Sequence, residues 1–322
     1  MSSSTLSALV HAMRYEAEGV ISIEVRPAPG TVPFPAFEPG AHVDLHLPNG
    51  LVRSYSLLEP ATGGRYLIGV LHDRNSRGGS RYVHQQLRVG MTLPVSVPRN
   101  NFALHESAAH SVLVAGGIGV TPMLCMLRRL AELGKPVDFI YCARSRKEAA
   151  FVDEISALAN SAIRLSFHFN DECGGPPDLR KLLGEYAADT HLYCCGPGPM
   201  LDAFERTCDA LGYANVHIER FTPLVDHGGE ALNADCYSVE LKRSGKTVTV
   251  PPGVSLLDAL LAAGVSHDYS CKEGVCGACE TKVLAGEVEH RDSILTKAER
   301  ASNKSMMVCV SGCRKGPLVL DI

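Results

Sequence analysis

The chain has 322 residues, 45% of them hydrophobic and 20% charged, with a formal net charge of −4. This is the composition of a globular protein long enough for two or three domains. The weakly acidic balance gives no support for binding nucleic acid or an anionic membrane surface, since both need clustered Lys and Arg.

Signals for export and membrane insertion are also missing from the sequence. No apolar run reaches the roughly 18 residues of a membrane span, and residues 1–8 lack the basic start and apolar stretch of a signal peptide. We therefore expect a cytoplasmic protein with no membrane contact. In a reducing cytosol, the 12 cysteines indicate metal or redox chemistry rather than disulfides.

The first third of the chain consists of short segments separated by Gly and Pro, for example 19–26, 42–47 and 65–71. Polar and apolar residues alternate within these segments, and this predicts an antiparallel β-barrel with a helix over 81–87.

Two motifs in this region suit a flavin. A flavin needs an aromatic surface for its ring, a hydroxyl near N5 and a cation for its phosphate, and Tyr55, Ser56 and Arg53 offer these in turn. Ser76-Arg-Gly-Gly-Ser80 is a second turn of the kind that binds phosphate. Taken alone, Arg53 and Tyr55 would also fit an exposed edge strand.

Residues 111–221 alternate apolar strands with helices, which predicts a parallel sheet covered by helices. A glycine turn, Gly116-Gly-Ile-Gly119, follows the first strand and leads into a helix over 121–131. It does not match G-x-G-x-x-G, so it is not the standard dinucleotide fingerprint. A second turn, Cys195-Gly-Pro197, ends a later strand. Two such turns at strand ends define a crevice for a nucleotide.

The last 90 or so residues contain the most specific signal, Cys271, Cys276 and Cys279 in a C-x4-C-x2-C pattern, followed by Cys309. This is the plant-type [2Fe–2S] spacing, whereas zinc ribbons pair C-x2-C with a second C-x2-C. Cys313 is more simply explained as a spare thiol. We expect strands over 237–241 and 247–250 and a helix over 256–263 before the cluster.

These patterns divide the chain into four segments. We expect an FMN-binding barrel over 1–105, a nucleotide-binding α/β domain over 106–224, a linker over 225–234 and a ferredoxin domain over 235–322.

The five motifs occur in the order found in the phthalate dioxygenase reductase family, which includes the reductases of vanillate O-demethylase systems, and the chain resembles that family along almost its whole length. The resemblance implies FMN in the barrel, a nicotinamide dinucleotide in the α/β domain and a [2Fe–2S] cluster in an α+β (β-grasp) ferredoxin domain.

The resemblance also implies roles for individual residues. The flavin contacts it implies are Arg53, Ser54, Tyr55 and Ser56, the backbone of Leu71 and His72, and a phosphate grip of Gly78, Gly79 and Ser80. The residues it places near the nicotinamide are Gly117, Thr121, Cys195, Gly196 and Pro197, with Phe221 over the flavin until the nicotinamide displaces it. Ser56, Thr121, Cys195 and Phe221 are the expected catalytic set.

The expected reaction follows from electron number. NADH gives up a hydride, which is two electrons, while a [2Fe–2S] cluster accepts one, and a flavin can exchange either number. We therefore expect hydride transfer to FMN, single-electron transfer to the cluster, and delivery to a Rieske-type oxygenase or demethylase by a monomeric reductase. NADPH remains an alternative donor, because Arg144 and Arg146 follow a strand where an adenosine ribose would lie.

Three other interpretations remain. The chain could be a free-standing flavin or ferric reductase, although a fused ferredoxin would then be unnecessary. It could be a non-catalytic iron–sulfur sensor, although the flavin and glycine motifs would then be unexplained. FAD could replace FMN, although no adenine platform is evident.

Overall fold

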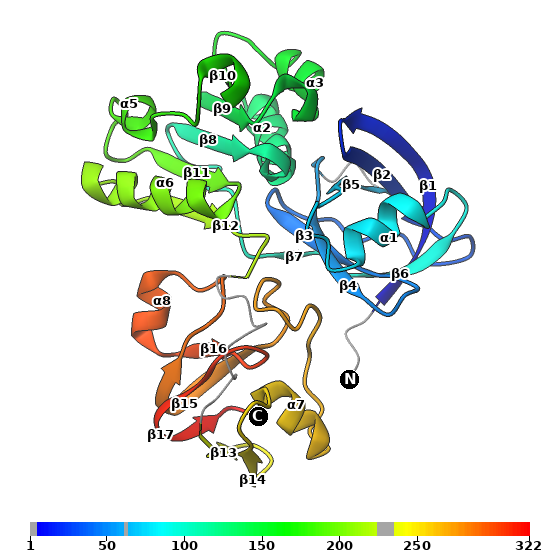
Figure 1. The fold of residues 1–322 in the computed structure, drawn as a ribbon, viewed down its shortest axis with the longest axis vertical. Coiled ribbons are helices and arrows are strands. Elements are labelled where there is room, and N and C mark those ends of the chain that lie inside the picture. The colour runs from blue at the N-terminus through cyan, green and yellow to red at the C-terminus, as the bar shows by residue number, and fades with distance from the viewer. Residues whose placement is uncertain (1–4, 61–63, 224–234) are drawn as a thin grey trace. The chain divides into compact units, whose positions relative to one another are not determined.

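The computed structural model describes residues 5–60, 64–223 and 235–322 (Figure 1). By their contacts, residues up to Glu219 form one compact unit and residues from Arg220 onward form another. No helix in the described part of the chain is both long and apolar enough to cross a membrane.

The first unit begins with a seven-stranded antiparallel sheet of order β4-β3-β6-β1-β2-β5, with β7 paired to β3. An isolated bridge between Leu57 and Ile68 joins the chain after β4 to β5, and this bridge closes the sheet into the predicted barrel. Its elements are β1 (Thr5–Ala17), β2 (Val20–Pro27), β3 (Ala41–His46), β4 (Val52–Ser56), β5 (Tyr66–Leu71), α1 (Gly79–Gln85), β6 (Thr92–Ser96) and β7 (Arg99–Asn100).

Helix α1 begins two residues earlier than the sequence pattern indicates and ends at Gln85. Gly78, which precedes it, has φ +95°, in the left-handed region that favours glycine. The glycine therefore turns the chain directly into the helix, and Gly79 becomes its first residue.

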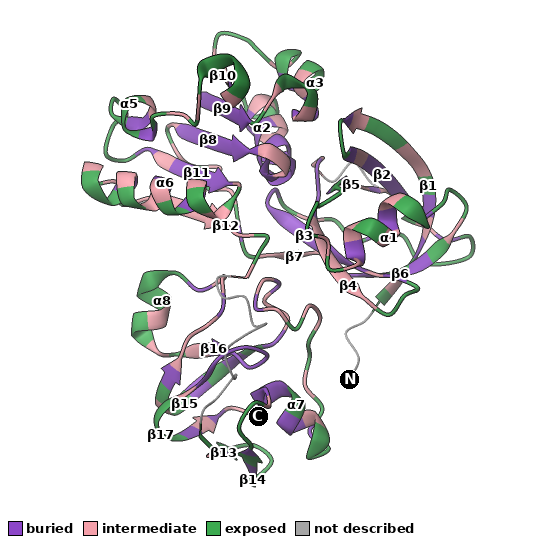
Figure 2. Ribbon diagram, in the orientation of Figure 1, coloured by how far each residue is buried: buried purple, intermediate pink, exposed green. Residues whose placement is uncertain are grey.

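The same unit continues into a five-stranded parallel sheet of order β10-β9-β8-β11-β12. The elements are β8 (Ser111–Gly116), η1 (Gly117–Gly119), α2 (Val120–Glu132), β9 (Val137–Ala143), η2 (Arg146–Glu148), α3 (Val152–Ser156), β10 (Ile163–Phe169), α4 (Asn170–Cys173), α5 (Leu179–Leu183), β11 (His191–Cys195), α6 (Gly198–Leu211) and β12 (Val216–Glu219). Strands β8 and β9 are buried along their whole length (Figure 2). Burial on both faces explains why these strands are continuous apolar runs.

Alternate residues of β8 serve two different cores. Leu113 and Ala115 pack with the buried face of α2 in a core that continues into the barrel. Val112 and Val114 pack with α5 and α6 on the other face of the sheet. Because the first core is shared, the barrel and the parallel sheet form a single compact unit.

The second unit is a five-stranded mixed sheet of order β14-β13-β17-β15-β16 with its own core. The elements are β13 (Tyr237–Leu241), β14 (Lys246–Val250), α7 (Leu256–Ala262), β15 (Glu280–Glu289), α8 (Lys297–Ser302), β16 (Ser305–Met307) and β17 (Gly312–Leu320). The predicted linker over 225–234 lies outside the described residues.

A buried charge holds the barrel strands together. The Asp44 carboxylate on β3 accepts hydrogen bonds from the Ser54 hydroxyl on β4, at 2.6 Å, and from the Arg99 guanidinium on β7. The backbone N–H of Asp44 donates to the Ser96 hydroxyl on β6 at 2.9 Å. Asp44 is completely buried, so these partners replace its water.

We predict that Asp44→Ala lowers the free energy of unfolding of the first unit by about 3–5 kcal/mol, because it leaves the Arg99 charge without its buried partner. Arg74→Ala, which removes an exposed ion pair with Glu148, should cost less than about 1 kcal/mol. The chain has no Trp, so denaturant unfolding is best followed by circular dichroism. Equal losses for the two variants would contradict this account.

Candidate functional site

The two glycine turns meet at the carboxyl edge of the parallel sheet. A Cβ on Gly119 would lie 2.1 Å from the carbonyl oxygen of Cys195, and a Cβ on Gly116 would lie 2.6 Å from the Met200 sulfur. The turn after β8 and the turn after β11 are therefore in direct backbone contact. Gly117 has φ +54° and open space where a side chain would be, so its backbone lines the crevice.

Two predicted catalytic residues are joined by a carboxyl group that the sequence analysis missed. The Ser56 hydroxyl at the end of β4 donates to Glu219 Oε2 at 3.4 Å. Glu219 ends β12 and lies beside Cys195 in the strand register. The three side chains therefore come from the barrel and from two neighbouring strand ends of the parallel sheet.

The environment of these groups favours their neutral forms. Enclosure by protein raises the pKa of the Glu219 carboxyl to about 8, against the opposing effect of the hydrogen bond from Ser56. Burial, followed by the negative charge of Glu219, raises the pKa of the Cys195 thiol well above its usual range. At neutral pH the cluster is therefore a protonated carboxyl, a thiol and a hydroxyl.

Glu219 was visible in the sequence only indirectly. It lies in Ile218-Glu-Arg-Phe221, where only the aromatic residue seemed notable. The register that pairs it with Cys195 depends on how β11 and β12 align, and one sequence cannot show this.

Thr121 lies where α2 meets the barrel. Its hydroxyl donates to the Ile118 carbonyl oxygen at 3.0 Å. A Cβ on Gly69, in β5, would lie 2.7 Å from the Thr121 methyl group. Gly69 thus allows the barrel to pack directly on the start of α2.

The Arg53 side chain lies over the Ser76–Ser80 turn, as expected if both bind one phosphate. A Cβ on Gly79 would lie 2.6 Å from the Arg53 side chain, and the Arg53 guanidinium donates to the Arg77 carbonyl oxygen at 3.3 Å. The Ser80 hydroxyl donates to the Ser76 hydroxyl at 2.9 Å. Arg53 and a turn that begins 23 positions later therefore place a cation, hydroxyls and the backbone of Gly78 and Gly79 together.

The other predicted flavin contacts differ in which of their groups are already used in hydrogen bonds within the protein. Tyr55 is half-buried, and burial raises its pKa to about 12, so the phenol stays neutral. The Ser54 hydroxyl is bound to Asp44. The backbone N–H of His72 donates to the Gly19 carbonyl oxygen at 2.7 Å, so a backbone contact from His72 would use its carbonyl. Leu71, the last residue of β5, is exposed.

Arg144 and Arg146, the two cations that follow β9, have different surroundings. The Arg146 guanidinium donates to both carboxylate oxygens of Glu172, at 3.1 and 3.3 Å, and lies over the Phe169 ring. The exposed Arg144 accepts a hydrogen bond at its backbone carbonyl from the Asp171 N–H. Of the two arginines expected near an adenosine ribose, Arg146 is therefore already paired with a carboxylate.

Phe221 is 37% exposed and lies just past the end of the first unit, so it belongs to the second unit by its contacts. Gly196 and Pro197 lie in the turn between β11 and α6, and Pro197 is the residue before the first turn of that helix.

The four predicted ligands come together in the second unit. The N–H of Glu273 donates to Cys271 Sγ at 3.3 Å, and the N–H of Cys271 donates to Cys276 Sγ at 3.5 Å. Hydrogen bonds from the Cys276 side chain and from the backbone of Glu273, Val275 and Cys276 lower the pKa of Cys271 to about 6, against the effect of burial. Contact with the Cys279 thiol raises the pKa of Cys309. Four cysteine sulfurs, two of which accept these backbone N–H groups, fit a [2Fe–2S] cluster.

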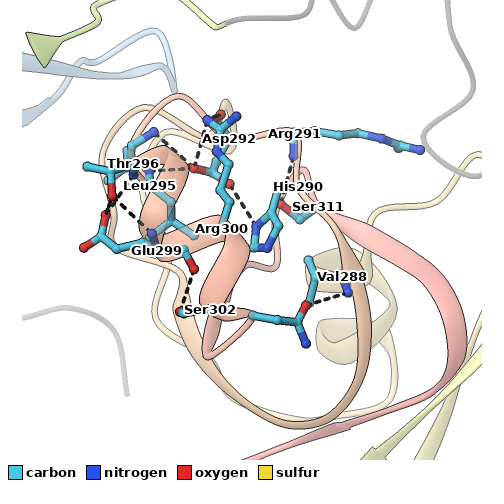
Figure 3. A network of polar contacts seen from close by, with 12 residues as sticks. Val288, His290, Arg291, Asp292, Leu295, Thr296, Glu299, Arg300, Ser302 and Ser311 are labelled. Carbon is cyan, nitrogen blue, oxygen red and sulfur yellow. Dashed lines mark hydrogen bonds and ion pairs between the residues drawn. The ribbon is translucent and has the colours of Figure 1, made fainter. Parts of the chain in front are cut away.

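Figure 3 shows a network of polar contacts around the buried carboxylate of Asp292, which supports the loop that carries these cysteines. Asp292 accepts hydrogen bonds from the N–H groups of Ile294, at 3.1 Å, and Leu295, at 2.8 Å, and its own carbonyl accepts one from Arg300. The next residue, Ser293, donates its N–H to the Gly274 carbonyl oxygen at 2.9 Å. Gly274 has φ +70°, so a glycine there allows the loop to turn against this network.

A barrel with a flavin-type motif, a parallel sheet with a dinucleotide crevice and a ferredoxin fold with four cysteines define an iron–sulfur flavoprotein oxidoreductase. Two family models match: the oxidoreductase NAD-binding domain over residues 113–206 and the 2Fe-2S iron-sulfur cluster binding domain over residues 239–314. The chain belongs to the phthalate dioxygenase reductase family. It is an NAD(P)H-dependent reductase that moves electrons through a flavin and a [2Fe–2S] cluster.

Similarity to known proteins extends over the whole chain. It is 45% identical to phenoxybenzoate dioxygenase subunit beta of Ectopseudomonas oleovorans, over 98% of this chain and 97% of that one. It is 41% identical to the vanillate O-demethylase oxidoreductase of Pseudomonas sp. (strain HR199 / DSM 7063), over 98% of this chain and 100% of that one.

Two solved structures are also similar to this chain over almost its whole length. That of phthalate dioxygenase reductase has a TM-score of 0.70 at 33% identity, over 99% of this chain and 98% of that one. An intact type IV self-sufficient cytochrome P450 monooxygenase has a TM-score of 0.87 at 37% identity, and this chain spans 41% of its length.

We predict that Cys276→Ser removes the cluster and leaves flavin chemistry in place, because the ligand lies in the second unit and the flavin motifs lie in the first. Iron and sulfide content should fall to a small fraction of the wild-type value, and NADH-dependent ferricyanide reduction should stay within about twofold. Cys313→Ser, whose thiol donates to the Gly316 carbonyl instead, is the matched control and should retain the cluster. Loss of ferricyanide reduction together with iron would argue against separate centres.

Proposed function

We propose that this chain is the reductase component of a two-component Rieske-type aromatic-ring oxygenase or O-demethylase, using NADH and FMN. The observation that carries the proposal is the meeting of Ser56, Glu219 and Cys195 in one compact unit. It joins the flavin motif of the barrel to the strand ends where a nicotinamide would bind. The cysteine loop on the same chain then supplies a one-electron exit.

FMN is favoured over FAD by what surrounds Arg53. The guanidinium, the Ser76 and Ser80 hydroxyls and the Gly78–Gly79 backbone form a compact group suited to one terminal phosphate. Tyr55 offers its ring for stacking, two residues along the same strand. Bound there, the flavin would supply exchange of either two electrons or one.

The chain's own groups have distinct tasks at the junction. The Ser56 hydroxyl is fixed by Glu219, so its position beside the flavin N5 would be set before substrate binds. Protonated Glu219 adds no negative charge to a site that must accept hydride. Thr121, Cys195 and the Gly117 backbone would orient the nicotinamide.

NADH is favoured over NADPH by the charges near Arg144. Glu172 neutralises Arg146, and its chain neighbour Asp171 donates its backbone N–H to the Arg144 carbonyl oxygen. A carboxylate suits the ribose 2′-hydroxyl of NADH, whereas a 2′-phosphate prefers uncompensated arginines.

The acceptor is the most specific part of the proposal. The named relatives include a dioxygenase subunit, a toluene-4-sulfonate monooxygenase reductase of Comamonas testosteroni at 43% identity and two vanillate O-demethylase oxidoreductases. A fused ferredoxin suits a protein acceptor, because a small acceptor could take electrons from the flavin itself.

A second candidate function has one observation in its favour. The chain is 44% identical to the tetrachlorobenzoquinone reductase of Sphingobium chlorophenolicum over 99% of its length. Direct reduction of a quinone is therefore the alternative activity.

The deciding experiment offers the NADH-reduced protein three acceptors under anaerobic conditions: a purified Rieske-type demethylase, a cytochrome P450 and a benzoquinone. The proposal expects reduction of the Rieske cluster in wild-type protein and little in Cys276→Ser. Fast quinone reduction that Cys276→Ser retains, without reduction of the Rieske protein, would support the alternative.

We predict that Arg53→Ala weakens FMN retention by about tenfold or more, because the phosphate loses a charge-assisted partner. Arg14→Ala, a charge loss on β1 of the same barrel, is the control and should retain flavin. Flavin content per chain after exhaustive dialysis measures the effect. Unchanged content in Arg53→Ala would remove that residue from the site.

We predict a pH dependence that depends on Glu219. Its pKa in the folded protein, about 8, is above the ordinary 4.5, so its contribution to stability is complete below about pH 4.5 and is lost as pH rises through about 8. The melting temperature should therefore fall between pH 6 and 8.5 in the wild type, and fall less in Glu219→Gln. Glu185→Gln, at an exposed position, should behave as wild type. Parallel curves for all three proteins would contradict the assignment.

A further inference from the structure

Three histidine side chains meet on the parallel sheet, away from the glycine turns. His191 is the first residue of β11, His217 lies in β12, and His105 lies in the connection between β7 and β8. One ring nitrogen from each lies within 4.8 Å of the other two. Residues that are as many as 112 positions apart therefore converge within the first unit, on none of the predicted cofactor motifs.

Neighbouring aromatic groups hold the histidines in place. The Tyr193 ring stacks on His217 with 4.5 Å between ring centroids and 17° between planes. The backbone N–H of His105 donates to the Tyr193 hydroxyl at 2.9 Å, which fastens the connection to β11. Tyr193 itself is completely buried. The cluster is thus attached to the core of the sheet.

The imidazoles are arranged as metal ligands rather than as charged groups. His191 Nδ1 and His217 Nε2 are 3.1 Å apart, and the two ring planes differ by only 9°, so one ring donates an N–H to the other. Burial, followed by the neighbouring His105, lowers the pKa of both rings, that of His217 to about 4. Neutral imidazole is the form that binds metals.

The distances suit one small cation. Zinc–nitrogen bonds of about 2.0–2.1 Å place two tetrahedral ligand nitrogens about 3.3 Å apart. The His191–His217 separation is already close to this value, and the third nitrogen needs to move by only about 1–1.5 Å. Modest rotations of the rings, which would replace the N–H···N bond by two nitrogen–metal bonds, are enough to complete the set.

A stack of aromatic rings without any ion is the simpler explanation, but it leaves one feature unexplained. Packing alone does not require a ring nitrogen of all three side chains to face a common point. Within the described residues, neither ring nitrogen of His105 has a protein hydrogen-bond partner.

We propose that His105, His191 and His217 bind one divalent transition-metal ion, with Zn²⁺ as the natural occupant and water at the remaining position. Three imidazoles are ligands of borderline metals such as Zn²⁺ and Cu²⁺ and are poor ligands for Mg²⁺ or Ca²⁺. The ion ties the connection at His105 to the starts of β11 and β12, so it stabilises the first unit. It is separate from the four cysteines, which lie in the second unit.

The test uses the intact holoprotein and measures Zn²⁺ uptake by equilibrium dialysis and elemental analysis. Wild type and the control His11→Gln, at an exposed position on β1, should bind one Zn²⁺ per chain that His105→Gln and His217→Gln bind at least tenfold more weakly. Because His105 is exposed, His105→Gln should disturb folding less than His217→Gln. Equal uptake by wild type and both variants overturns the proposal.

A second readout identifies the ligands. Oxidised flavin and an oxidised [2Fe–2S] cluster are diamagnetic, so the EPR spectrum of one equivalent of Cu²⁺ is not masked. We expect nitrogen hyperfine structure from imidazoles in wild type, reduced in His105→Gln. Identical spectra in both proteins would show that copper binds elsewhere and would contradict the assignment.

Discussion

The architecture of the first unit depends on backbone contact at glycines. Gly119 can lie against the Cys195 carbonyl only because it has no Cβ, since a methyl group there would lie 2.1 Å from the oxygen. The same is true of Gly69 against Thr121. The first contact closes the dinucleotide crevice and the second attaches the barrel to it.

The two compact units of the chain correspond to two different chemical steps. Hydride transfer needs two molecules held in one geometry, and the residues proposed for it, Phe221 excepted, lie in a unit with a continuous core. The cluster loop lies in a second unit with a core of its own and is supported locally by the Asp292 network. Electron transfer to a protein partner is a separate step from hydride transfer. The two steps can therefore be carried by separate units.

Much of the fold and of the cluster site could be predicted from the sequence, because some residue types have few structural uses. Four cysteines in a plant-type spacing and glycines at strand ends each indicate one chemistry. The barrel followed from the alternation of polar and apolar residues, and the parallel sheet from the alternation of strands and helices. Glu219 could not be found, because its importance comes from strand register and enclosure. The partner of Arg146 and the position of the histidine cluster likewise depend on contacts between distant residues, which no local pattern contains.

Hydride chemistry in the first unit should feed the cluster in the second. Anaerobic titration of the oxidised holoprotein with NADH, followed by optical and EPR spectroscopy, tests it directly. The account predicts that full reduction takes about one and a half equivalents of NADH, two electrons for the flavin and one for the cluster, with a reduced [2Fe–2S] EPR signal. An end point near one equivalent with no cluster signal would contradict it.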